Sequence, residues 1–446
     1  MFETVLVANR GEIARRVIRT VQGMGLRAVA VYSEADRDLP YVTEADESVL
    51  IGAAPPAQSY RSVEALLEAA HRTGSQAVHP GYGFLAEDPS FAARVQDAGL
   101  VWVGPRPESI GAMGDKIRAR NLVAAVGMPV SRGSTEPVLD VASAVRAAER
   151  IGYPLMVKAS AGGGGMGMAV AADEDALVVE FARVQSFAGR MFGDPSVLLE
   201  RYFPRVRHVE VQVLGLADGR VVALGERECS VQRRNQKLVE ESPSPAVGPE
   251  LRLRMLASAV RAAEAVGYLN AGTIECLLDV DSGEFFFLEM NTRLQVEHPV
   301  TELVQRIDIV EQQLLVAAGE PVTFDPDALQ PTGHAIEMRV NAEDPVRFLP
   351  GPGAITVWEE PSGEGVRVDA GYAAGTTVTP HYDSLMAKLV VHGVDRDEAI
   401  SRARDAVRAF HIEGPKCNLP FFGELLDHPH FLSGQYDTGL VGRMRS

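Results

Sequence analysis

The chain has 446 residues, more than a single hydrophobic core usually takes, so two or three subdomains are expected. Its 46% hydrophobic and 23% charged residues are typical of a soluble globular protein. The net charge of −17 argues against a nucleic-acid-binding surface as the main function.

The cysteines and the N-terminus bear on the cellular compartment. Cys229, Cys276 and Cys417 show no metal-type spacing, and their odd number is typical of a reducing compartment. A catalytic thiol is the alternative for one of them. No apolar run approaches the roughly 20 residues of a membrane span, and the N-terminus lacks a signal-peptide pattern. We therefore expect a cytoplasmic protein that does not interact with membranes.

The chain opens with a βαβ pattern. Val5–Ala8 and Arg27–Tyr32 are predicted strands, and Gly11–Met24 between them carries apolar residues at helical spacing. This order predicts a parallel sheet. The turn Asn9–Glu12 lacks the glycine fingerprint of dinucleotide-binding proteins, so no dinucleotide site is predicted.

A loop punctuated by glycine and proline follows at His79–Glu87. Such loops at strand ends of α/β sheets often line an active cleft. A tight turn around a buried Tyr82 and Phe84 fits the pattern equally well, so the role of Glu87 stays open. Val101–Gly104 is the next predicted strand.

A second subdomain is expected at residues 130–203, after a Gly-Met-Pro break. Tyr153–Lys158 is an apolar predicted strand that ends in a lysine, and five glycines follow within residues 162–167. Backbone N–H groups of such a loop can converge on a phosphate, and the lysine adds a point charge. The lysine precedes the glycines, unlike in a P-loop; a flexible surface turn is the alternative. Val197–Tyr202 is the strand that returns.

Two polar segments follow. Arg207–Val213 alternates polar and apolar residues, which predicts a half-buried strand, and His208 on it would by itself be a surface residue. Glu226–Lys237 is a dense polar run, for which a solvated loop is the simplest interpretation.

The strongest pattern is a hairpin. Thr273–Asp279 and Glu284–Met290 are strand-like, with turn residues between them. A turn centred on Ser282 places Glu275 opposite Glu289, and Asn291 shares the face of Glu289. Two carboxylates and an amide facing one point suit Mg²⁺ or Mn²⁺. The alternative is a hairpin whose acids face water.

Polar residues crowd directly after this hairpin. Arg293, Gln295, Glu297 and His298 offer a cation, an amide and a carboxylate. Beside a metal, such groups can hold a small oxyanion and move a proton from it.

The segment EMNTRLQVEHPVTE (residues 289–302) closely resembles the signature of the biotin carboxylases, which are ATP-grasp enzymes of biotin-dependent carboxylase systems. Residues 5–17, 79–87, 334–345 and 382–388 also match that family's pattern. The resemblance covers essentially the whole chain.

The resemblance implies an α/β and α+β fold in three domains. These are an N-terminal parallel-sheet (pre-ATP-grasp) domain at residues 1–115, an ATP-grasp region at 116–330 with a mobile lid at about 130–203, and a C-terminal β-rich domain at 331–446. ATP would phosphorylate bicarbonate to carboxyphosphate, which yields CO₂ for the carboxylation of biotin.

Residue roles follow from the same resemblance. The ATP-binding residues would be Lys116, Lys158, Gly163, Gly164, Gly165, Met168, Glu200, Arg201, Tyr202, Phe203, His208, Gln232, Asn235, Glu275 and Glu289. Two Mg²⁺ or Mn²⁺ ions would bind to Glu275, Glu289 and Asn291. Bicarbonate would bind to Lys237, Arg293, Gln295, Val296 and Glu297. Glu297 would be the general base, and Arg339 would stabilise the biotin anion, so that the catalytic residues are Arg293, Glu297, Lys237 and Arg339.

Three positions depart from the common family pattern. Met166 stands where Arg or Lys is frequent in the family. Arg201 stands where Lys is frequent. Asn235 stands where His is frequent; asparagine still donates a hydrogen bond but carries no charge. Some subunits that act with larger acyl-CoA partners carry Asn at this position. These departures bear on affinity and rate more than on the reaction.

The partners implied are a biotin carboxyl carrier protein and carboxyltransferase subunits, as in an acetyl- or acyl-CoA carboxylase of fatty acid biosynthesis, and a homodimer. The tail from Asn418 to Thr438 is closer to acyl-CoA or pyruvate carboxylase subunits than to the best-known bacterial acetyl-CoA form. The acceptor stays open. Lys388 is expected to be structural. The alternatives are another ATP-grasp ligase, against which the unrepeated chain argues, and a non-catalytic assembly subunit.

Overall fold

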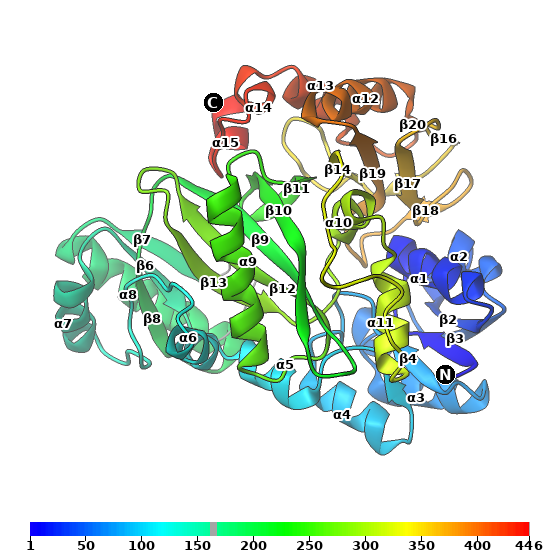
Figure 1. Ribbon diagram of the computed structural model, residues 1–446, viewed down its shortest axis with the longest axis horizontal. Coiled ribbons are helices and arrows are strands. Elements are labelled where there is room, and N and C mark those ends of the chain that lie inside the picture. Colours follow the sequence, from blue (N-terminus) through cyan, green and yellow to red (C-terminus); the bar gives the residue numbers. More distant parts are fainter. Residues whose placement is uncertain (161–166, 446) are drawn as a thin grey trace.

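The computed structural model describes residues 1–160 and 167–445, and its N-terminal part is built on a parallel sheet of order β3-β2-β1-β4-β5 (Figure 1). All of the neighbouring strands in this sheet pair in parallel, as the βαβ pattern predicts. The strands are β1 (Thr4–Val7), β2 (Arg27–Ser33), β3 (Glu47–Gly52), β4 (Ala77–His79) and β5 (Val101–Trp102).

Helices follow the strands of the N-terminal sheet, and the last of them, α6 (Lys116–Ala125), packs against the central sheet. The predicted helix after the first strand is confirmed, whereas the predicted strand Val101–Gly104 keeps only its first two residues. Asp115 caps the last of these helices by accepting from the backbone of Ile117 and Arg118, which places Lys116 in its first turn. The helices are α1 (Gly11–Gly23), η1 (Glu34–Asp36), α2 (Pro40–Glu44), η2 (Pro56–Gln58), α3 (Val63–Arg72), α4 (Pro89–Asp97), α5 (Pro107–Gly114) and α6 (Lys116–Ala125).

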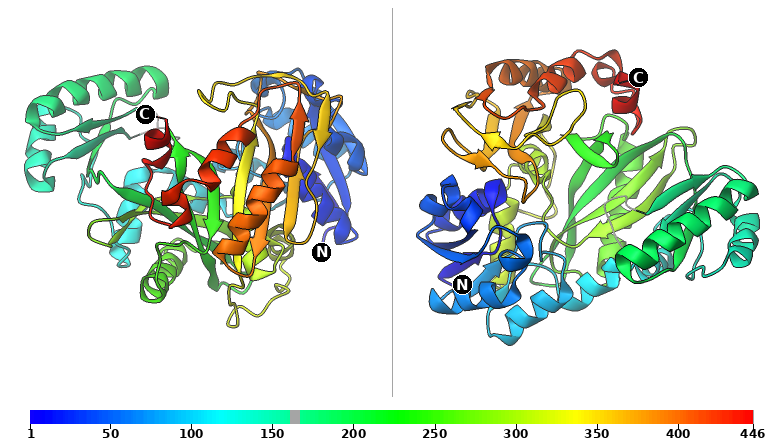
Figure 2. Two further views of the ribbon diagram at one scale, coloured as in Figure 1. Left: turned by 90° about the horizontal axis from the view of Figure 1, so that it is seen from above. Right: turned by 180° about the vertical axis from the view of Figure 1, so that it is seen from behind.

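The predicted lid, residues 130–203, forms a small α/β unit at one end of the molecule (Figures 1 and 2). Its antiparallel sheet has the order β7-β6-β8, and two helices pack on it around a separate hydrophobic core. The glycine-rich prediction at Gly163, Gly164 and Gly165, and the departure at Met166, lie outside the described residues. The elements are α7 (Val141–Ile151), β6 (Leu155–Ala159), β7 (Met168–Ala171), α8 (Glu174–Phe192) and β8 (Val197–Arg201).

A long antiparallel sheet forms the centre of the molecule, in the order β13-β12-β9-β10-β11-β14-β19-β17. Helix α9 (Pro249–Glu264) packs through Met255 and Ala259 against apolar residues of this sheet. The strands are β9 (Val206–Gly215), β10 (Val221–Arg233), β11 (Gln236–Ser242), β12 (Asn270–Asp279), β13 (Phe285–Asn291), β14 (His334–Asn341), β17 (Val366–Ala370) and β19 (Leu385–Gly393).

This sheet crosses from the predicted ATP-grasp region into the predicted C-terminal domain, because β11 pairs with β14. One hydrophobic cluster likewise includes residues of the N-terminal sheet, the central sheet and the C-terminal helices. The remaining elements are α10 (His298–Gln305), α11 (Ile309–Ala317), β15 (Gly353–Ala354), β16 (Val357–Glu359), β18 (Thr377–Val378), α12 (Arg396–Ala409), β20 (His411–Glu413), α13 (Leu419–Leu426), α14 (Pro429–Leu432) and α15 (Leu440–Met444).

The central hairpin has the predicted register. Glu275 pairs with Glu289 and Thr273 with Asn291 across β12 and β13, with a bulge directly after Glu275 that shifts the pairing by one residue toward the turn. The predicted half-buried strand 207–213 is part of β9, but its polar residues are buried as well.

The solvated-loop interpretation of Glu226–Lys237 is wrong. This segment forms most of β10, the tight turn at Arg234 and Asn235, and the start of β11. Both turn residues have positive φ, of 51° and 66°. Residues 226–232 are buried, and Arg227 and Glu228 among them pair with charges on β9. A polar composition does not reveal such pairing.

None of the helices in the described ranges has the length and apolar character that crossing a membrane requires.

Candidate active site

Most of the predicted site residues line one cavity of about 920 Å³. It lies between the hairpin β12–β13, the start of α6, the tip of the hairpin β10–β11 and the segment that follows β13. The predicted residues that line it are Lys116, His208, Asn235, Lys237, Glu275, Glu289, Asn291, Arg293, Gln295, Val296, Glu297 and Arg339.

The hairpin supplies oxygen ligands to this cavity. Glu275 and Glu289 stand directly opposite each other. Glu275 is buried, and Glu289 is half-buried. Burial and the charge of Glu275 raise the pKa of Glu289, because two carboxylates here repel. Two carboxylates and the Asn291 amide oxygen form a donor set that suits a hard divalent cation.

His208 and Glu210 on β9 extend the acidic cluster. The Nε2 atom of His208 lies 3.0 Å from Glu275, and one ligand atom each of His208, Glu210 and Glu275 lie within 4.8 Å of one another. Burial opposes the charge of His208, but the neighbouring Glu275 outweighs it and raises the pKa of the imidazole.

Lys237 is the cationic centre of the cavity. Its Nζ atom lies 2.7 Å from Glu210, 2.8 Å from Glu275 and 2.6 Å from Glu297. Burial disfavours the ammonium, yet the three carboxylates raise the pKa of Lys237 well above its ordinary value. One lysine therefore connects the hairpin carboxylates to the predicted general base.

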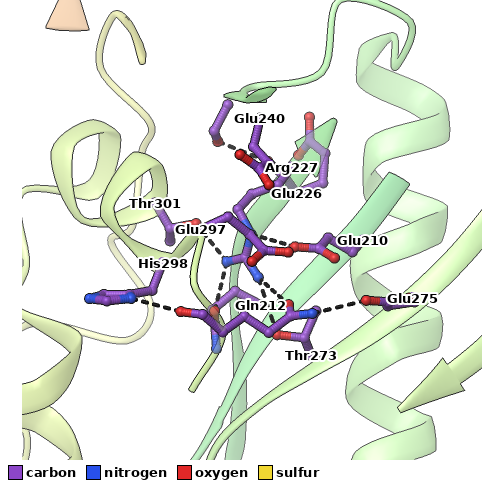
Figure 3. A network of polar contacts seen from close by, with 12 residues as sticks. Glu210, Gln212, Glu226, Arg227, Glu240, Thr273, Glu275, Glu297, His298 and Thr301 are labelled. Atoms are coloured by element: carbon purple, nitrogen blue, oxygen red, sulfur yellow. Dashed lines mark hydrogen bonds and ion pairs between the residues drawn. The ribbon is translucent and has the colours of Figure 1, made fainter. Parts of the chain in front are cut away.

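A fully buried arginine, Arg227 on β10, forms hydrogen bonds that fix several side chains of this cavity (Figure 3). Its guanidinium donates to Glu210 at 2.6 Å and to Gln295 at 2.8 Å. It also donates to the side chains of Gln212, Thr273 and Thr301. Gln295 in turn donates to Glu275 at 2.9 Å. Arg227 thus fixes side chains from β9, β12, the segment after β13 and α10.

Glu297 lies between two cations. Its carboxylate contacts Lys237 on one oxygen and Arg339 on the other, at 2.9 Å. Burial opposes its ionised form, but Lys237, Arg339 and Arg227 hold the pKa of Glu297 well below its usual range. The carboxylate is ionised at neutral pH.

Arg293 is held at the mouth of the cavity. Its Nε donates to Glu87 at 2.9 Å and its Nη2 to Asn291 at 3.1 Å. Glu87 also accepts from the backbone of Thr292 at 2.9 Å. The structure thus places the open sequence candidate Glu87 in the cavity wall, where it orients Arg293.

A second cavity, of about 490 Å³, adjoins the first. Arg293, Val296 and Arg339 line both, and Tyr82 and Tyr382 line the second. Arg339 thus stands where the two spaces meet.

Lys388 lies beneath this junction. Its fully buried Nζ donates to the Val296 carbonyl at 3.0 Å and lies 3.1 Å from Glu12, which accepts a hydrogen bond from Tyr82. These contacts agree with the expectation that Lys388 is structural.

The lid-side candidates do not line the first cavity within the part of the chain that the structure describes. Lys158 pairs with Glu200 at 2.7 Å, and Met168 pairs with Lys158 across the lid sheet. Arg201 donates to the Tyr153 carbonyl, and the Tyr202 backbone to Pro154. The remaining two are Phe203, stacked on Phe286, and Gln232, buried in β10.

The thiol alternative loses its chemical basis. Burial raises the pKa of Cys229, Cys276 and Cys417, so each thiol is protonated at neutral pH and is a poor nucleophile.

Sequence reasoning missed Glu210, Arg227 and Glu240 as parts of the site. Glu210 carried a usable signal, because alternation places it on the face of His208. Arg227 and Glu240 carried none, since their importance depends on which strands pair.

Family models match almost the whole length of the chain. The model for the biotin carboxylase N-terminal domain matches residues 1–110, that for the carbamoyl-phosphate synthase L chain ATP-binding domain matches 115–324, and that for the biotin carboxylase C-terminal domain matches 337–443. The chain is 48% identical to biotin carboxylase 2 of Bacillus subtilis over 99% of each chain. It is 47% identical to a pyruvate carboxylase subunit of Methanothermobacter thermautotrophicus, over 100% of this chain and 90% of that one.

Solved structures match equally well. A biotin carboxylase from Campylobacter jejuni, in a β,γ-ATP complex, matches with a TM-score of 0.97 at 41% identity over 99% of both chains. The biotin carboxylase domain dimer of the Hydrogenobacter thermophilus 2-oxoglutarate carboxylase, with MgADP, ADP and bicarbonate, matches with a TM-score of 0.95 at 42% identity over 99% of this chain and 98% of that one. The predicted fold is confirmed, and the chain belongs to the biotin carboxylase family.

Proposed function

We propose that this chain carboxylates biotin with bicarbonate and ATP at the junction of the two cavities. The observation that carries the proposal is the meeting of Glu297 with Lys237 and Arg339 at that junction. One carboxylate there contacts a cation that faces the acidic hairpin and a cation that faces the second cavity. Such a carboxylate can serve a reaction that links the two spaces.

ATP belongs to the first cavity and the lid. Lys116 and Lys158 supply positive charge for the phosphates, and Glu200 to Phe203 form the segment that returns from the lid. Closure of the lid would exclude water from a labile intermediate. Gly163, Gly164 and Gly165 keep their proposed role in holding phosphates.

Divalent cations fit the hairpin. Glu275, Glu289 and Asn291 would hold two Mg²⁺ or Mn²⁺ ions, which neutralise charge on transferred phosphate. The crowding of carboxylates here makes a cation favourable.

Bicarbonate belongs between Lys237, Arg293 and the segment Gln295–Glu297. Arg293 can grip a planar oxyanion with two donors, and Lys237 adds a point charge. The positive charges of Arg293 and Lys237 would also lower the pKa of a bound bicarbonate. Glu297 is the general base, because its carboxylate is ionised and can take the bicarbonate proton. The cations that lower its pKa also make it a weak base until bicarbonate binds beside them.

Biotin belongs in the second cavity. ATP phosphorylates bicarbonate to give carboxyphosphate and ADP, and carboxyphosphate breaks down to CO₂ and phosphate. The phosphate takes the N1 proton of biotin, and N1 then attacks CO₂. Arg339 lines this cavity and carries a strongly held positive charge. A fixed cation there stabilises the enolate-like anion of biotin.

Glu297→Gln tests the proposal. Glutamine cannot accept the proton, so transfer of labelled carboxyl from ¹⁴C-bicarbonate to free biotin should fall by about a hundredfold or more. MgADP binding, measured by calorimetry, should survive. The matched control is Glu284→Gln, the same change at an exposed position of the hairpin turn.

Label transfer near the wild-type rate in Glu297→Gln would remove Glu297 from the base role. Wild-type protein that transfers no label to biotin, while it binds MgATP, would instead favour a non-catalytic assembly subunit.

The partners and the domain limits are proposed on the same footing. A biotin carboxyl carrier protein would present biotin, and carboxyltransferase subunits would take the carboxyl group onward. A cytoplasmic homodimer with domain limits near residues 115 and 330 fits this arrangement. One relative is a subunit of a pyruvate carboxylase. In the Rhizobium etli pyruvate carboxylase, the match covers 40% of that chain.

A further inference from the structure

Arg339 has a second anionic partner that the reaction does not use. Glu240 on β11 is fully buried, and its carboxylate lies 2.5 Å from the Nη2 atom of Arg339. The same nitrogen lies 2.9 Å from Glu297. One guanidinium nitrogen is therefore shared between the proposed general base and a carboxylate behind it.

A third buried carboxyl group makes this arrangement unusual. Glu337 stands directly opposite Glu240 across β11 and β14, and it too is fully buried. Among the described residues, neither carboxyl group has a hydrogen-bond partner, but Glu240 forms an ion pair with Arg339. Two adjacent buried carboxyls cannot both ionise at low cost, and only Glu240 contacts a cation directly.

The charges around Glu240 agree with this division. Burial raises the pKa of Glu240 to about 7 and that of Glu337 well above its usual range. The charged and titratable groups that face Glu240 are Arg339 and Glu337 from β14, Lys237 from β11, Glu297 from the start of α10 and Cys229 from β10. Glu337 is thus neutral at neutral pH. Glu240 is divided between its neutral and ionised forms there, and Arg339 favours the ionised form.

Arg339 needs such a partner because Glu297 changes charge during the proposed reaction. When Glu297 takes a proton, its attraction for Arg339 falls. A guanidinium with no other anion would then be free to leave the junction. Glu240 offers a contact that remains when Glu297 is protonated, because loss of the Glu297 charge favours the anion of Glu240.

We propose that Glu240 is the positioning residue of Arg339, which keeps the guanidinium at the junction of the two cavities in both protonation states of Glu297. The inference rests on the proposed function. It assigns Glu240 no contact with substrate and Glu337 no part in the reaction.

Glu240→Gln and Glu337→Gln test this as a matched pair of buried carboxyls on facing strands. In Glu240→Gln, kcat/KM for free biotin should fall by about ten- to a hundredfold, the loss expected when a contact to a charged group is removed. The KM for ATP and the bicarbonate-dependent release of ADP without biotin should stay near wild type. Glu337→Gln replaces a group that is already neutral and should leave all three quantities unchanged.

Equal effects of the two variants, or an unchanged kcat/KM for biotin in Glu240→Gln, would overturn the proposal. Should Glu240→Gln fail to fold, Glu240→Asp keeps the charge at greater distance and should show a smaller loss confined to biotin; a loss that also affects ATP would count against it.

A crystal structure of Glu240→Gln or Glu240→Asp separates this proposal from the proposed function. Arg339 displaced from the junction supports the positioning role even if the wild type carboxylates no biotin. Arg339 in its original place refutes the role, whatever the enzyme does.

Discussion

Single buried charges determine what the cavity can do, because each is held ionised by the others. Lys237 keeps Glu275 and Glu297 ionised, and these carboxylates keep Lys237 charged. Such mutual support lets opposite charges stand in a desolvated space without neutralising. The same support makes each of them costly to remove alone.

Arg227→Met should show this cost. The change leaves buried Glu210 and Gln295 without their guanidinium partner, so the free energy of unfolding should fall by about 3–5 kcal/mol. Urea unfolding of the wild type and the variant at neutral pH measures the difference.

Arg220→Met is the control, since Arg220 pairs with exposed Asp218 just before β10. Its effect should be negligible beside that of Arg227→Met, because exposed ion pairs contribute little. Equal destabilisation by both changes would show that Arg227 does not support the site.

The site residues within the signature segment 289–302 could be predicted from the sequence. The buried residues that hold them in place could not. Glu297 and Arg293 were found because they follow the hairpin directly. Glu240 and Arg227 act through contacts between strands that are distant in the sequence. Nothing local distinguishes them from surface charges.

At the level of elements, the hairpin β12–β13 was predictable because its turn and its apolar residues set the register. The bulge after Glu275 was not, since it depends on how β12 also pairs with β9. The hairpin β10–β11 was not predicted, because its composition is polar. Its polar residues suggested water, but they face charges on neighbouring strands.

Glu241 on β11 ties the central sheet to the C-terminal helices and should make that tie depend on pH. Its carboxylate lies 2.6 Å from His334 and 2.7 Å from Arg396 on α12, and it accepts from Tyr436. Burial opposes its charge, but the His334 contact and Arg396 lower the pKa of Glu241 from the usual 4.5 to about 2.

A depressed carboxylate pKa stabilises the folded state above the pKa of the unfolded chain, and the contribution disappears as the pH falls toward the folded value. Glu241→Gln should therefore lower the free energy of unfolding by about 3 kcal/mol at pH 7. The deficit should shrink between about pH 4.5 and pH 2. Urea unfolding of both proteins at pH 7, 5 and 3 measures it; a deficit that is constant with pH would contradict this account.

Over the whole molecule, one continuous sheet joins parts that family models treat as separate domains. The models end and begin at residues 324 and 337, whereas β11 and β14 pair across that interval. This pairing brings Arg339, from the C-terminal part, to Glu297 and Lys237. The sequence indicated three regions, but it could not show that the site depends on their common sheet.

In the proposed function, ATP cleavage is coupled to bicarbonate and biotin. The most direct test is the release of ADP by the wild-type protein in Mg²⁺, with and without bicarbonate and free biotin. We predict that ADP release requires bicarbonate, rises with biotin and stops when a chelator removes the metal. ADP formed without bicarbonate, with some other acceptor, would contradict the account and indicate a different ATP-grasp ligase.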